Sequence, residues 1–183
     1  MPIRTIGAGS AAGGALELIF SETVGSGGAT SLSTGTLPTG YKQLTIHLYG
    51  RSDGTYVVKA DEVLIALNGD TTNGNYVQCA NFFGDSDGNY LNTETRNVFS
   101  IPGHTADASF FASCIAQVTS PEGTDGYKSI TSHFASHRDS TANRYGYNSA
   151  VTWKNTAAIT SIALTLRTGD FVEGTTLLVT GVK

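Results

Sequence analysis

Hydrophobic and polar residues alternate along most of this chain. Leu44, Ile46 and Leu48, for example, are separated by polar residues. A period of two places alternate side chains on opposite faces of a β-strand. No long window carries the stripe of an amphipathic helix with capping residues, so the pattern predicts an all-β protein. The nine predicted strands lie within residues 16–20, 44–48, 63–67, 76–83, 110–118, 127–137, 147–153, 162–166 and 176–182.

Turn signals separate these segments. Asp-Gly or Asn-Gly pairs stand at 53–54, 68–69, 73–74, 87–88 and 125–126, and Glu-Gly stands at 173–174. These residues tolerate the positive φ that tight turns require. Strands joined in this way favour an antiparallel β-sandwich. The long polar connections favour a jelly-roll-like arrangement over a closed up-and-down barrel.

The first 40 residues have a different composition from the rest. Residues 7–14 and 25–40 are mostly Gly, Ala, Ser and Thr around one short apolar stretch. We therefore expect an extended Gly/Ala/Ser-rich N-terminal arm with the first short strand at 1–40, and a β-sandwich domain at 41–183. Because bare backbone can pair with an exposed sheet edge, we expect residues 1–40 to contact neighbouring copies more than their own domain. We also expect the core strands to begin after residues 1–14.

Composition indicates a weakly charged surface. Charged residues make up 14% of the 183 residues, against about 25% in typical soluble domains. The chain contains 22 Gly and 42 Ser or Thr residues, and its formal net charge is −4. Such a surface repels its own copies weakly, so we expect self-association.

The same composition argues against several classes of partner. The pI is near 5.4 and no run of Lys or Arg occurs, so we expect no nucleic-acid partner. No segment is apolar and long enough to span a membrane, and the N-terminus lacks the apolar core of a signal peptide. We therefore expect no membrane partner and synthesis in a cytosol. Two cysteines are too few for a disulfide scaffold, and Cys114 lies in an apolar run where we expect it to be buried.

One segment matches the G-x-S-x-G pattern of a nucleophile elbow. It comprises Gly50, Arg51, Ser52, Asp53 and Gly54. A nucleophile elbow needs a helix after the serine, whereas strand-forming residues follow here. We therefore expect a hairpin turn and no catalytic nucleophile.

Two oxygen-rich segments resemble cation loops only in part. Asp85 to Asn89 places oxygens at alternate positions, but Tyr90 stands where a calcium loop needs Gly and Arg96 where it needs an acid. We expect a polar turn there. The second segment contains Asn68, Asp70, Asn73 and Asn75, for which we expect Asx-turn hydrogen bonds.

Histidine spacing argues against a metal site. His133 and His137 on one strand would stand about 13 Å apart, which is too far to share a zinc ion. His104 lies on another segment, and no Cys or carboxylate stands at ligand spacing. We expect surface or interface histidines, which can make assembly sensitive to pH.

No acid–base pair of a glycosidase can be located from the loop aspartates. Such chemistry needs two carboxylates about 5–10 Å apart. Trp153 is the single Trp, and we expect it to be buried in the sandwich rather than exposed to a sugar. We therefore expect no enzyme activity, no catalytic residues, no cofactor and no metal.

Three segments carry a family resemblance. They are YKQLTIHLYGRSD, ALNGDTTNGNY and WKNTAAITSIALTLRTGDFVEGT, which lie between residues 41 and 175. In them the chain resembles tailed-bacteriophage virion structural proteins, found as head, decoration or tail-associated components. Residues 78–151 resemble the family in general character, and the end of the chain departs from its common Leu-Tyr-Gly closing. The resemblance implies a jelly-roll-like sandwich, a place on the virion, no cofactor and no catalytic residues.

Within that family the motifs have structural interpretations. We expect residues 68–76 to form a hairpin turn between two strands. We expect Gly169 and Asp170 to form a turn before Phe171, whose ring would fill one end of the sandwich.

Three functions remain open. The first is a capsid decoration, or cement, protein that stabilises the shell by self-association, as a homotrimer, and by binding the major capsid protein. The alternative is a tail-fibre or receptor- or glycan-binding virion protein. The third, an enzyme such as a depolymerase, lacks an identifiable acid–base pair. The expected location is the virion, assembled in the host cytoplasm.

Overall fold

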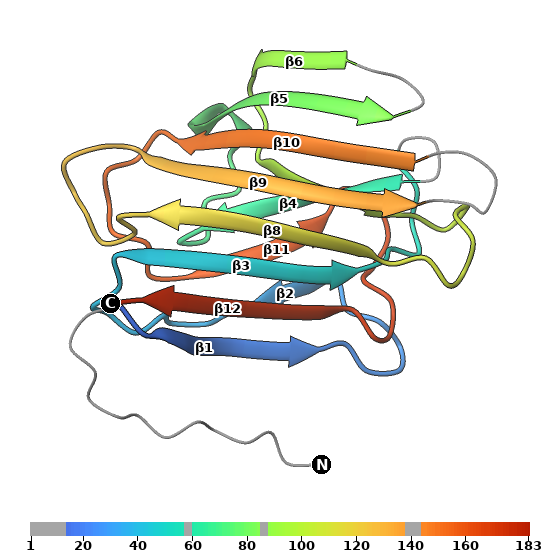
Figure 1. Cartoon of the computed structure of the whole chain (residues 1–183), viewed down its shortest axis with the longest axis horizontal. Helices are drawn as coiled ribbons and strands as arrows, with labels where there is room; N and C mark the ends of the chain where they lie inside the picture. Colours follow the sequence, from blue (N-terminus) through green and yellow to red (C-terminus); the bar gives the residue numbers. More distant parts are fainter. Residues whose placement is uncertain (1–13, 57–59, 85–87, 138–143) are drawn as a thin grey trace.

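The computed structural model describes residues 14–56, 60–84, 88–137 and 144–183 (Figure 1). These residues are almost entirely β-strand and loop, with one short 3₁₀ turn at Asn73–Asn75. Within them, no helix is long and apolar enough to cross a membrane. The strands are β1 (Leu16–Thr23), β2 (Ser31–Ser33), β3 (Gln43–Gly50), β4 (Ala60–Leu67), β5 (Tyr76–Gly84), β6 (Gly88–Thr93), β7 (Asn97–Pro102), β8 (Ala112–Thr119), β9 (Lys128–His137), β10 (Arg144–Trp153), β11 (Ile162–Leu166) and β12 (Thr176–Val182).

The strands form two packed antiparallel sheets. The large sheet has the order β1-β12-β3-β8-β9-β10-β5-β6, and the small sheet has the order β2-β11-β4-β7. Figure 1 shows the large sheet in front and the small sheet behind it. The predicted all-β, antiparallel sandwich is confirmed.

Eight of these strands have the connectivity of a jelly roll. The chain passes alternately between the sheets from β1 to β4 and again through β7, β8, β11 and β12, which gives β1-β12-β3-β8 facing β2-β11-β4-β7. Two hairpins are inserted into this frame: β5–β6 between β4 and β7, and β9–β10 between β8 and β11. The inserted hairpins pair with each other through β5 and β10. They extend only the large sheet, which is therefore much wider than the small one (Figure 1).

All nine predicted strands are present, and the structure adds β2, β6 and β7. The missed strand β7 is buried at every position: it pairs with β4 at the edge of the small sheet and packs against β8, β9 and β10 of the large sheet. A strand buried on both faces loses the alternation that marks a half-exposed strand. Strand β2 has only three residues, too few to show any period.

Residues 14–40 belong to the sandwich. Strand β1 pairs with β12 along its length, and β2 pairs with β11. Val24, Leu32 and Leu37 are buried in the common core. The core strands therefore begin at β1, and the arm expected at residues 1–40 is not separate from the sandwich over residues 14–40. Residues 1–13, the rest of the expected arm, lie outside the described part of the chain.

Two connections were expected to be hairpin turns and instead cross between the sheets. Asn68 and Gly69 do form a tight turn with positive φ values of 52° and 75°, closed by a hydrogen bond from Asp70 N–H to Leu67 O (2.9 Å). The strands on either side, β4 and β5, nevertheless lie in different sheets. Residues 50–54 likewise lead from β3 in the large sheet towards β4 in the small sheet.

The core lies between the two sheets and contains apolar and polar zones. Trp153, Phe99 and Phe171 are among its largest fully buried side chains, which confirms the expectations for Trp153 and Phe171. Beneath the inserted hairpins the interior is polar. There the amide nitrogen of Gln78 donates to Asn97 O (2.8 Å) and lies 2.6 Å from the hydroxyl of Tyr147. The extended part of the large sheet is thus held partly by buried hydrogen bonds.

Candidate functional site

The serine of the G-x-S-x-G segment is buried in a hydrogen-bond network. Ser52 is fully buried, and its Oγ donates to Asp61 Oδ2 (2.9 Å) while accepting from Gly54 N–H (2.9 Å). Asp61 also accepts from Thr168 Oγ1 (3.0 Å). Burial raises the pKa of Asp61, and the hydrogen bonds from Ser52, Thr168 and the Glu62 amide oppose that shift. The geometry joins three segments and leaves the Ser52 hydroxyl without access to solvent.

An ion pair lies beside this hydrogen-bond network. Arg167 Nε lies 2.7 Å from Glu62 Oε2, and the Arg167 guanidinium lies 4.4 Å from the centre of the Tyr56 ring. Burial raises the pKa of Glu62, and the Arg167 charge opposes the rise. These contacts hold the first residues of β4 against the loop that follows β11.

Arg51, the second residue of the same motif, binds main-chain carbonyls of the segment before β8. Its Nη1 donates to Asp107 O (2.8 Å) and its Nη2 to Ala106 O (2.8 Å), with longer contacts to His104 O and Phe110 O (both 3.4 Å). Burial lowers the pKa of the guanidinium, and the Asp107 charge opposes the shift. We call this arrangement the Arg51 clamp. It fixes residues 104–110 against the end of β3.

The oxygen-rich segment at residues 68–75 is a hydrogen-bonded turn around Asp70. Asp70 Oδ2 accepts from Trp153 Nε1 (2.8 Å) and Asn75 Nδ2 (2.9 Å), and Oδ1 accepts from Thr72 N–H (3.0 Å). The expected Asx-type turn chemistry is confirmed. The other expected polar turn covers residues 85–89. Residues 85–87 lie outside the described residues, and Gly88 and Asn89 begin strand β6.

Replacing Asp70 with Asn is expected to lower the free energy of unfolding by about 1–2 kcal/mol, measured by urea denaturation. An amide cannot accept at both Oδ positions, so either the Trp153 indole N–H or the Thr72 amide loses its acceptor. Asp125→Asn, in an exposed turn, should change stability by less than about 0.5 kcal/mol. An equal effect of both substitutions would contradict the assigned role of Asp70.

The Asp70 contribution should also depend on pH. Desolvation raises the pKa of Asp70, but the hydrogen bonds from Trp153, Thr72 and Asn75 outweigh it and lower the pKa below its usual value. A lowered native pKa stabilises the folded protein above the unfolded value of about 3.9, and this stability is lost as the pH falls through the native pKa. The stability difference between the unchanged protein and Asp70→Asn should therefore narrow in acid.

The described histidines do not converge. His133 is exposed on β9, with its Nδ1 2.7 Å from Asn148 Oδ1, and His104 is exposed in the loop before β8. The side chain of His137 lies outside the described set. In the part of the chain that the structure covers, no group of three His, Cys, Asp or Glu side chains could hold a metal ion. Cys114 is buried, as expected, and burial raises the pKa of its thiol.

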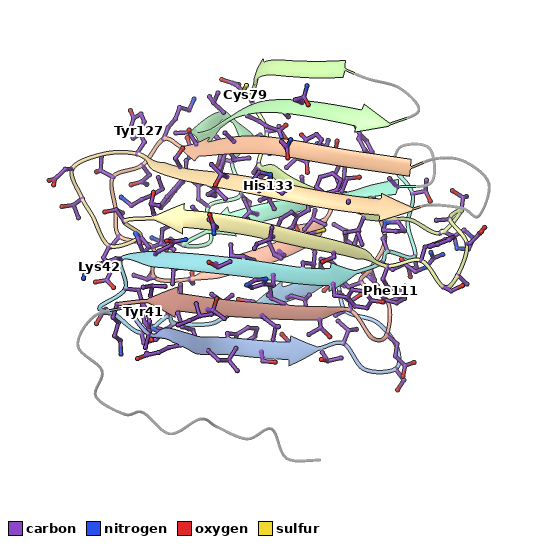
Figure 2. All side chains as sticks on the ribbon, viewed as in Figure 1. Tyr41, Lys42, Cys79, Phe111, Tyr127 and His133 are labelled. Carbon is purple, nitrogen blue, oxygen red and sulfur yellow. The ribbon has the colours of Figure 1, made fainter. Side chains whose placement is uncertain are left out.

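The most distinctive surface is the outer face of the large sheet, which we call the neutral face (Figure 2). Every outward-pointing side chain described on strands β1, β12, β3, β8, β9, β10 and β5 is uncharged or a histidine. These side chains are Leu16, Leu18, Ser21, Thr23, Gln43, Thr45, His47, Tyr49, Val77, Cys79, Asn81, Ser113, Ile115, Gln117, Thr119, Ser129, Thr131, His133, Ala135, Asn148, Ala150, Thr152, Thr176, Leu178, Thr180 and Val182.

The rim of the neutral face exposes large apolar groups. Leu16 and Leu18 on the edge strand β1 are 66% and 55% exposed. Near the opposite end of the strands, Tyr49 stacks on Phe111 with ring centroids 5.0 Å apart. Figure 2 places Phe111 at one end of the face, Tyr41 and Lys42 at the other, and His133 near its middle. The Arg51 clamp holds the segment that leads to Phe111 and so helps to place this aromatic pair.

Charged side chains gather instead at the ends and edges of the sandwich. Glu17 pairs with Lys183 (2.9 Å), and this ion pair and a hydrogen bond from the Tyr41 hydroxyl lower the pKa of Glu17. Glu94 lies 3.9 Å from Lys154 beyond the strand ends. The sequence contains the signal for the neutral face, because the polar positions of its alternating strands are Thr, Ser, Gln or Asn. Only the register shows that these positions share one surface.

Comparison with known proteins identifies no relative: no family model, no curated protein and no solved structure matches the chain.

Proposed function

We propose that the chain is a non-enzymatic structural protein of a tailed-phage virion that packs its neutral face against neighbouring protein subunits. The absence of ionised side chains from this face, among the residues described, carries the proposal. Burying an unpaired charge in an interface is costly, whereas a face of hydroxyl, amide and aliphatic groups can be buried without that penalty. A soluble surface with no need to be buried has no physical reason to exclude charge.

The size of the neutral face fits a protein interface. Seven strands about 4.8 Å apart, each with about seven residues rising 3.3 Å, give on the order of 700 Å². A standard interface buries roughly 800 Å² on each partner. The inserted hairpins contribute β9, β10 and β5 to this area, so the wide face is a product of the additions to the jelly-roll frame.

Within this class, a capsid decoration protein is the function that we favour. It would stabilise the shell by self-association, with a homotrimer as the expected form, and by binding the major capsid protein. The weak net charge and the resemblance of residues 41–175 to virion proteins support this choice.

A receptor- or glycan-binding tail protein is the second candidate. The stacked pair of exposed Tyr49 and partly buried Phe111 favours it, because stacked aromatic rings present a flat apolar surface of the kind on which sugar rings pack. Competition for host adsorption separates the two candidates, since a decoration protein should not block adsorption of intact phage.

The test uses purified, undecorated phage shells and the full chain. We expect the chain to cosediment with the shells and to raise their resistance to heat. Thr131→Lys puts a charge on the neutral face and should reduce the bound amount at least about tenfold, because the charge must be desolvated. Thr71→Lys, in an exposed loop away from this face, should bind as the unchanged chain does. Failure to bind shells, together with absence of the protein from purified particles, would contradict the proposal.

A further inference from the structure

The centre of the neutral face has an arrangement that suits one particular occupant. Ile115 on β8 is paired with His47 on β3 and with His133 on β9, so the three side chains form a row across the middle of the sheet. Around this row the side chains are uncharged, as with Thr45, Gln117 and Thr131. The row continues to Leu178 on β12 and Asn148 on β10.

We infer that the occupant of the neutral face is a second copy of this chain, packed face to face about a two-fold axis near Ile115, in a dimer that acid dissociates. This two-fold pairing takes the place of the homotrimer expected above, because a contact closed about a two-fold axis holds two copies. The inference rests on the proposed function, because it names the partner and the regulation of the same face.

Charge favours a second copy over another partner. Each chain carries a formal net charge of −4, so two copies repel wherever charged surfaces meet. The neutral face is the broad surface on which two copies can meet without like charges opposed. A strongly charged partner would find no complementary charge on it.

The shape of the face also favours self-packing. An isologous contact needs a surface that complements its own copy after a two-fold rotation. Two sheets pack face to face at about 10 Å, with small side chains such as Ser and Thr leaving room for the larger ones to interdigitate. Rotation near Ile115 would bring His47 and His133 of both copies into the buried centre.

The two histidines make this interface sensitive to acid. His47 is faced by Leu178 and Ile115 on the neighbouring strands, and His133 by Ile115 and Asn148. Tyr49 and Cys79 are the other titratable groups on the described face, and no carboxylate lies on it. Histidine gains its charge between about pH 7 and 5, so protonation would place uncompensated positive charges at the centre of the dimer. Dissociation at low pH is the consequence.

Sedimentation equilibrium of the full chain tests the inference at about pH 7.5 and about pH 5. We expect a dimer near neutral pH and a rise of at least about tenfold in the dissociation constant in acid. The double variant His47→Gln with His133→Gln should stay dimeric at both values. Thr131→Lys should weaken the dimer at least about tenfold at both values, and Thr71→Lys should leave it unchanged. Circular dichroism on each sample verifies that the β-fold persists.

Each contrary result has a distinct meaning. A trimeric mass that is insensitive to Thr131→Lys overturns the two-fold pairing, as does acid dissociation that persists in the histidine double variant. A chain that is monomeric alone yet binds shells through a contact sensitive to Thr131→Lys overturns this inference and leaves the proposed function intact. A chain that neither pairs nor binds shells overturns both.

Discussion

Phe171→Ala is expected to lower the free energy of unfolding by about 3–5 kcal/mol, as is typical when a fully buried aromatic ring is truncated. Phe171 is fully buried at one end of the sandwich. Its backbone exchanges hydrogen bonds with Ala29 (2.8 and 2.9 Å), and the adjacent Val172 N–H donates to Arg51 O (3.1 Å). The ring therefore fills the place where three distant segments meet, and its loss leaves a cavity that these bonded backbones cannot close.

Urea denaturation measures this effect, and two further variants control for it. Phe171→Leu keeps most of the apolar volume and should cost less than about 1.5 kcal/mol. Tyr127→Ala removes an aromatic side chain that is 61% exposed and should change stability by less than about 0.5 kcal/mol. A loss below about 1 kcal/mol in Phe171→Ala would show that the site collapses around the smaller residue, contrary to the expectation.

The alternation of residue types predicted most of the strands because most strands have one face in the core and one in solvent. Strand β8 shows the rule, with Ala112, Cys114, Ala116 and Val118 inward and polar residues or Ile115 outward. Strand β7 lies outside the rule because its residues 97–102 are buried on both faces. Local composition does not predict that residues 14–40 join the sandwich, because their few apolar residues, such as Leu32, complete a core supplied mainly by other strands.

Turn signals predicted the local backbone conformation but not which sheet the next strand joins. Asn68 and Gly69 have the positive φ values that the pair indicates. The hydrogen bond from the Trp153 indole N–H to Asp70 then holds this turn against the large sheet, which the chain joins in β5. Such contacts join residues far apart in sequence, and no local pattern specifies them. The neutral face also depends on residues far apart in sequence, because they share one surface only through the register of seven strands.

Arg51→Ala is expected to lower the free energy of unfolding by about 3 kcal/mol, because hydrogen bonds to a charged group contribute about 1.5–3 kcal/mol and buried carbonyls would lose their donor. Arg51→Lys should recover little of this, since one ammonium cannot reproduce the planar fork that reaches the carbonyls of both Ala106 and Asp107. The damage should be greatest in residues 104–110, where hydrogen exchange should accelerate.

The Arg51 clamp also makes a prediction about the neutral face, which distinguishes it from a general contribution to stability. Phe110 O is one of its acceptors, and the next residue, Phe111, stacks on Tyr49 at the rim. Arg51→Ala should therefore disturb the ring resonances of Tyr49 in an NMR spectrum recorded on the folded protein. Arg167→Ala is the matched control, because it removes a half-exposed guanidinium that pairs with Glu62, and its cost should be about 1 kcal/mol or less with the Tyr49 resonances unchanged. Equal losses of stability in the two variants, with Tyr49 unaffected in both, would show that the Arg51 clamp does not position Phe111 against Tyr49.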